Sequence, residues 1–88
     1  GCWRATCILA KAGRKVKWNC PNCDICILFP VGRTPLAGGA TQVSGRSPLS
    51  ADIDKNASGY YIYCAIVKGR NGVVHSVEGG SPPEMVIE

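Results

Sequence analysis

The sequence predicts an all-β fold, a single small β-sandwich that spans residues 1–88, on three observations. A chain of 88 residues provides one modest hydrophobic core, and therefore one domain. Its 11 glycines and 6 prolines make it rich in turns, and no segment shows the apolar spacing of an amphipathic helix. The apolar residues instead fall into roughly six or seven short runs rich in β-branched and aromatic side chains, which are typical of strands.

The first half of the chain contains three segments that we expect to be strands: residues 5–10, 15–19 and 25–29. In the second segment polar and apolar residues alternate, which places Val16 and Trp18 on one face of a half-buried strand. The third is a continuous apolar run that stops at Pro30, as expected of a strand buried on both faces. A turn over residues 11–14 connects the first two strands.

The second half begins with a long irregular connection over residues 31–50, rich in glycine, proline, serine and threonine. A short strand or helical turn is expected near its end, at residues 49–53. Residues 60–67 form the clearest strand, because β-branched and aromatic side chains dominate there. The last two predicted strands are residues 73–77, which follow an Asn-Gly hairpin turn, and residues 85–87.

Four segments resemble, in the same order, segments of the cupredoxins, the family that includes plastocyanin and pseudoazurin. KAGRKVKWN at residues 11–19 resembles their K-A-G-D-x-V-x-W/F-x-N segment, and ILF at residues 27–29 resembles the end of their I-x-F strand. ASGYYIYC at residues 57–64 resembles the G-x-Y-x-Y/F-x-C strand whose cysteine ligates copper. MVIE at residues 85–88 resembles the closing strand M-x-G-x-I/V. The resemblance implies a cupredoxin-like Greek key.

An immunoglobulin-like sandwich is the closest alternative to the cupredoxin resemblance. It would rest on four residues: Cys7, Trp18, Tyr61 and Cys64. Too little chain precedes Cys7 for a first strand, and Tyr61 lies three rather than two residues before Cys64. The cupredoxin resemblance is therefore favoured.

The histidine count argues against a blue-copper function. A type-1 copper site is built from two histidines, one cysteine and a weak axial methionine. This chain has one histidine, His75, which lies well beyond Cys64 on the far side of the Asn-Gly turn. We therefore expect the fold without the type-1 site, since a fold does not carry a function with it.

The six cysteines are the main chemical feature of the sequence. An even number in a short chain favours disulfides, and with them a secreted or periplasmic location. The cupredoxin resemblance implies that Cys64 lies near Cys23 or Cys26, where a disulfide would staple the two sheets. The alternative is a soft-metal binding or carrier protein, because C-x2-C-x2-C is also a thiolate-cluster spacing suited to Cu(I) or Zn(II). Its ligands would be Cys20, Cys23, Cys26 and Cys64.

Aromatic residues provide a candidate binding surface. We expect Tyr60 and Tyr63 on the opposite side of their strand from Tyr61. Exposed beside Trp3, this pair would bind a sugar or a protein partner, whereas packing within the sheet is the simpler interpretation.

Several classes of function find no support in the sequence. The chain has no G-x-S-x-G motif, phosphate loop or paired carboxylates near a histidine, so we expect no enzyme activity. A net charge of +4 is too mild for nucleic-acid binding, and the longest apolar run is too short to span a membrane. The sequence thus favours a monomeric binding or structural module with no required cofactor, whose partner is a protein or a small ligand.

Overall fold

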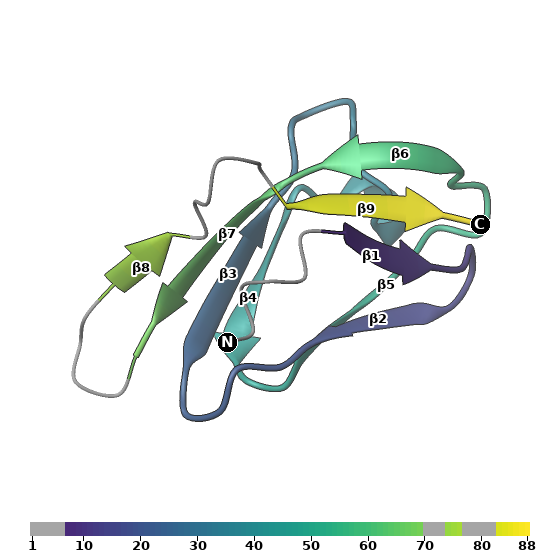
Figure 1. Cartoon of the computed structure of the whole chain (residues 1–88). Helices are drawn as coiled ribbons and strands as arrows, with labels where there is room; N and C mark the ends of the chain where they lie inside the picture. The colour runs from purple at the N-terminus through teal and green to yellow at the C-terminus, as the bar shows by residue number, and fades with distance from the viewer. Residues whose placement is uncertain (1–6, 70–73, 77–82) are drawn as a thin grey trace.

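The computed structural model describes residues 7–69, 74–76 and 83–88, and within them the fold is all-β (Figure 1). Nine strands form three small sheets there, an arrangement compatible with the predicted β-sandwich. The helical content of the described residues is one short 3-10 element, η1 (Ala37–Gly39), and no helix among them could cross a membrane. The strands are β1 (Cys7–Ala10), β2 (Lys15–Trp18), β3 (Asp24–Leu28), β4 (Gln42–Arg46), β5 (Leu49–Asp52), β6 (Gly59–Ile62), β7 (Cys64–Lys68), β8 (Val74–Ser76) and β9 (Glu84–Ile87).

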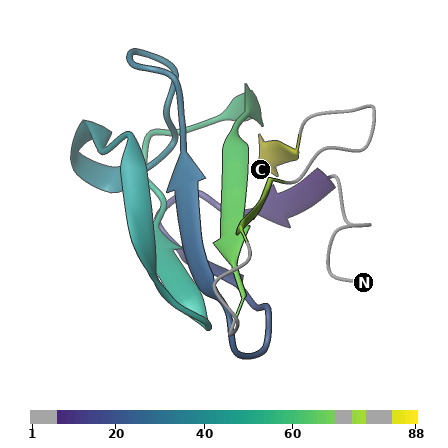
Figure 2. The ribbon, with the colours of Figure 1, turned by 90° about the vertical axis from the view of Figure 1, so that its left-hand side faces the viewer.

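The largest sheet has the strand order β4-β3-β7-β8, with every neighbouring pair antiparallel. Figure 2 shows β4, β3 and β7 of this sheet side by side. A second sheet has the order β1-β9-β6, in which β1 runs parallel to β9 and β6 antiparallel to it. The third pairs β2 with β5. Consecutive strands β2 and β3 therefore belong to different sheets, and the turn between them joins the two.

All three sheets contribute to one hydrophobic core. Ile27 of β3 and Met85 of β9 are fully buried in it. Aromatic side chains fill part of the core: the Tyr63 ring lies 5.1 Å from Phe29 and 6.1 Å from Trp18, centroid to centroid. The indole Nε1–H of Trp18 also donates a hydrogen bond to the Tyr63 hydroxyl at 3.2 Å. The core thereby satisfies the polar groups that these two aromatic residues bring into it.

The strand predicted at residues 15–19 and the turn before it are confirmed. In β2 the lysines are exposed, whereas Val16 and Trp18 are buried, as the alternation predicts. The preceding turn closes through a hydrogen bond from the Arg14 N–H to the Lys11 carbonyl, at 3.1 Å. Its tight geometry uses Gly13 at φ +76°, a conformation that a residue without a Cβ adopts readily.

The prediction that both faces of the third strand are buried is wrong. In β3 the inward residues Ile25 and Ile27 are buried, but Cys26 and Leu28 are half-buried and Asp24 is exposed. The four-stranded sheet packs against the core on one side, which is the side of Ile25 and Ile27. A continuous apolar run is thus compatible with a strand that has one core face.

The long connection predicted at residues 31–50 contains a strand that the sequence pattern does not reveal. β4 has one apolar side chain, Val43, and most of its residues are exposed. It forms through backbone pairing with β3, at the edge of the four-stranded sheet. The short strand expected next to it is confirmed as β5.

The segment predicted as one strand at residues 60–67 is two strands in different sheets. The break falls at Tyr63, whose N–H donates to the Pro83 carbonyl at 3.1 Å. The predicted return and closing strands are confirmed as β8 and β9, while residues 70–73 of the hairpin turn lie outside the described residues. One continuous segment therefore contributes β6 to the three-stranded sheet and β7 to the four-stranded sheet.

Candidate functional site: the thiol pair between β2 and β3

The turn that joins β2 to β3 places two cysteines side by side. It closes through a hydrogen bond from the Cys23 N–H to the Cys20 carbonyl, at 3.1 Å. Pro21 presets the backbone for the first corner, and Asn22 adopts φ +62° at the second, the pattern of a type II turn. We call these four residues the 20–23 turn: Cys20, Pro21, Asn22 and Cys23.

The two sulfur atoms of the 20–23 turn are 2.7 Å apart. A disulfide bond is about 2.05 Å long, so the pair is not bonded, yet it lies close to bonding distance. Among the four cysteines whose side chains the structure describes, no pair forms a disulfide bond. Two thiols in this position form a disulfide on losing two electrons and two protons.

A serine from a distant loop holds both ends of the turn. The Cys20 N–H donates to the Ser47 hydroxyl at 2.8 Å, and that hydroxyl donates to the Asn19 side-chain oxygen at 3.0 Å. The Ser47 N–H donates to the Cys23 carbonyl at 2.9 Å. Ser47 lies in the connection between β4 and β5, so the tertiary fold fixes the geometry of the thiol pair.

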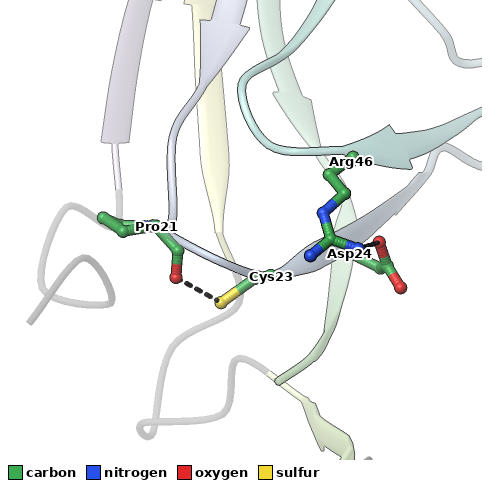
Figure 3. Close-up of polar contacts among 4 residues, drawn as sticks. All are labelled: Pro21, Cys23, Asp24 and Arg46. Atoms are coloured by element: carbon green, nitrogen blue, oxygen red, sulfur yellow. Dashed lines mark hydrogen bonds and ion pairs between the residues drawn. The ribbon is translucent and has the colours of Figure 1, made fainter. Parts of the chain in front are cut away.

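The two thiols differ in their exposure. Cys20 is 8% exposed and belongs to the hydrophobic core, whereas Cys23 is only partly buried. The Cys23 sulfur points toward the Pro21 carbonyl oxygen, 3.4 Å away (Figure 3). Next to it the Asp24 carboxylate faces the Arg46 guanidinium at 3.8 Å, an exposed ion pair. Solvent therefore reaches the pair from the Cys23 side.

The other two predicted site cysteines lie elsewhere. Cys26 is within β3, opposite Ser44 and Ile66, and Cys64 is opposite Leu28 at the far end of the strand. At 3.3 Å per residue, this end is about 16 Å from Cys23. Cys64 is also offset by two residues from Cys26 along the paired strands.

The structure therefore does not bring Cys20, Cys23, Cys26 and Cys64 together. Among the described residues, no group of three or more His, Cys, Asp or Glu side chains is placed to hold a metal ion. The register of β3 with β7 is the physical reason, because it sends Cys64 to the opposite end of the sheet from the 20–23 turn. What the structure does assemble is a two-sulfur site.

The predicted aromatic surface is not formed as expected. Tyr63 is 5% exposed and lies in the core, so its placement in an exposed pair with Tyr60 is wrong. Tyr63 lies two residues after Tyr61, so a period of two places it on the face of Tyr61, which packs against the core, and not on the face of Tyr60. Tyr60 is 45% exposed and its hydroxyl bonds to the Glu84 carboxylate, while Trp3 lies outside the described residues.

The sequence contained one signal for the thiol pair and none for the hydrogen bonds from Ser47 that hold it. Proline followed by asparagine between two cysteines indicates a tight turn. Nothing local links this turn to Ser47, which is 27 residues from Cys20. No protein-family model matches the chain, and searches of the curated proteins and of the solved structures found no match.

Proposed function

We propose that this chain is a small secreted or periplasmic β-sandwich, cupredoxin-like in the order of its segments but without a type-1 copper site. It acts as a monomeric binding or structural module for a protein or a small ligand, stapled by a disulfide between Cys20 and Cys23. The observation that carries the proposal is the 2.7 Å separation of the two sulfur atoms. A cysteine-rich chain of this length is typical of oxidising compartments, which supports the location.

The disulfide would hold the corner between two sheets. The 20–23 turn connects β2 of the two-stranded sheet to β3 of the four-stranded sheet. In the chain-entropy model, closing a loop of four residues stabilises the folded state by about 2 kcal/mol. For a domain of this size, whose net stability is on the order of 5 kcal/mol, this is a large share.

The test is a peptide map of the protein purified under air and alkylated without reduction. Trypsin cleaves after Lys17, and an endoproteinase specific for Asp cleaves before Asp24, which isolates the peptide WNCPNC at residues 18–23. We expect this peptide without alkyl groups and two hydrogens lighter than its dithiol form. Cys26 leaves in a separate peptide and serves as the internal control. Recovery of WNCPNC with both cysteines alkylated would overturn the proposed staple.

A second function is favoured by the convergence of two thiols in one turn. Cu(I) is a soft ion that takes thiolate ligands, whereas a structural Zn(II) site needs four ligands. Anaerobic titration of the reduced protein with Cu(I) against a competing chelator tests this alternative. A carrier function requires that Cys23→Ser loses one bound Cu(I) while Cys64→Ser, remote from the turn, keeps it. Equal Cu(I) content in the two variants excludes the 20–23 turn as a copper site.

A further inference from the structure

We infer that the disulfide between Cys20 and Cys23 undergoes thiol–disulfide exchange at one sulfur only, that of Cys23, with a low-molecular-weight thiol as the reactant. This inference rests on the proposed disulfide and adds an activity to it. Cys20 then acts as the internal leaving and resolving thiol.

Exposure is the first observation that supports this assignment. Exchange requires an attacking thiolate to reach a disulfide sulfur from outside the protein, so its site depends on access. Cys20 is 8% exposed and is part of the core, while Cys23 packs against the core but is only half-buried, and its sulfur faces the Pro21 carbonyl oxygen (Figure 3). The sulfur of Cys23 is therefore the one that an incoming thiolate can reach.

The anchoring of the turn is the second observation. The Cys20 N–H is bonded to the Ser47 hydroxyl, so the backbone of the buried cysteine is held within the fold. When the S–S bond opens, Cys20 stays in place behind Cys23. A cysteine held 2.7 Å from its partner sulfur is well placed to attack the mixed disulfide and expel the small thiol again.

The reaction balances without an added oxidant. A thiolate RS⁻ attacks the Cys23 sulfur, forms the bond Cys23–S–S–R and releases Cys20 as a thiolate. A second RS⁻ attacks the R sulfur of this mixed disulfide, forms RSSR and releases the Cys23 thiolate. In the reverse direction the Cys23 thiolate attacks RSSR and releases RS⁻, after which Cys20 attacks Cys23 and closes the protein disulfide.

Charge next to Cys23 determines the choice of probe. Asp24 is paired in register with Arg46 on one side and Lys68 on the other, which places two cations beside one anion. Like charges repel and opposite charges attract across such an exposed surface, although weakly. Glutathione carries carboxylates, and its oxidised form is therefore a suitable reactant.

The experiment compares Cys20→Ser, which leaves the Cys23 thiol, with Cys23→Ser, which leaves the Cys20 thiol. Each reduced variant is incubated with oxidised glutathione, quenched with acid and cleaved to the peptide at residues 18–23. We expect Cys23 to acquire glutathione at least about tenfold faster than Cys20, because access controls the rate. In guanidinium the two rates should converge, since unfolding removes the difference in burial. Equal rates in the folded variants, or a faster reaction at Cys20, would overturn the inference.

A measurement without substitutions protects the test against variants that fail to fold. Reduced wild-type protein is labelled with a small amount of iodoacetamide, and fragmentation of WNCPNC gives the ratio of label on its two cysteines. The expected excess is again on Cys23. The two proposals fail separately: an absent crosslink in the oxidised protein sinks the staple, while a crosslink with no preference between the sulfurs sinks only the exchange at Cys23.

Discussion

Two stretches of the chain have the same cysteine spacing and opposite outcomes. Between Cys20 and Cys23 two residues intervene, as between Cys23 and Cys26. The first pair flanks a tight turn, and its sulfurs are 2.7 Å apart. The second pair runs into β3, where an extended backbone rises about 3.3 Å per residue and separates the two positions by about 10 Å. Cysteine spacing therefore predicts a site only together with the backbone conformation.

The comparison extends to the surroundings of each thiol. Cys20 lies in the core and is anchored by Ser47, whereas Cys26 lies on the outer face of β3 with the Gln42 amide 3.8 Å away. The first thiol lies in a turn held by hydrogen bonds to Ser47, while the second lies within a strand flanked by β4 and β7.

The largest effect is expected from the inner face of β3. Ile27→Ala removes a fully buried side chain and should lower the free energy of unfolding by about 3 kcal/mol, through lost burial and the cavity left behind. Cys26→Ala, the adjacent position on the outer face, should lower it by less than about 1 kcal/mol. Denaturant unfolding of both variants measures the contrast. Equal losses would contradict the assignment of the two faces.

The next effect concerns the proposed staple. Under oxidising conditions, Cys23→Ser should lower the free energy of unfolding by about 2 kcal/mol, because the turn is no longer crosslinked. Cys26→Ser is the matched control and should change it little. In the presence of a reductant the wild type should lose the same amount and the difference from Cys23→Ser should vanish. A difference that persists in reductant would show that the serine acts by other means than the disulfide.

Ser47 should have a smaller effect. Ser47→Ala removes the acceptor for the Cys20 N–H and should lower the free energy of unfolding by about 1 kcal/mol. It should also slow the formation of the disulfide from the reduced protein. The rate is measured as the increase of unalkylated WNCPNC with time. Ser50→Ala, on the exposed side of β5, is a control from the same region. Unchanged closure in Ser47→Ala would mean that the 20–23 turn keeps its geometry unaided.

The smallest effect is expected at the ion pair beside Cys23. Asp24→Asn removes the exposed contact with Arg46 and should change the free energy of unfolding by less than about 0.5 kcal/mol. Formation of the crosslink should be unaffected, because the turn and not the ion pair brings the thiols together. A loss of the crosslink in this variant would mean that charge, and not the backbone geometry of the turn, brings the two thiols together.

Local sequence patterns correctly predicted a strand such as β2, where the alternation of polar and apolar residues also shows which side chains are buried. In β2 the alternation of lysines with Val16 and Trp18 determines which face is inward, and the turn before it follows from Gly13. β4 could not be predicted in this way, because it has one apolar side chain and forms through its backbone pairing with β3. The prediction for Tyr63 failed because a period of two places residues 61 and 63, and not 60 and 63, on one face, and that face packs on the core.

The all-β class and the tight turn at Cys20-Pro21-Asn22-Cys23 follow from local patterns, because periodicity and turn chemistry act over a few residues. Which cysteines meet depends instead on contacts between segments far apart in the sequence. The register of β3 with β7 carries Cys64 away from the turn, and Ser47 anchors the turn from 27 residues along the chain. Both depend on hydrogen bonds between segments far apart in the sequence, which no local pattern of side chains encodes.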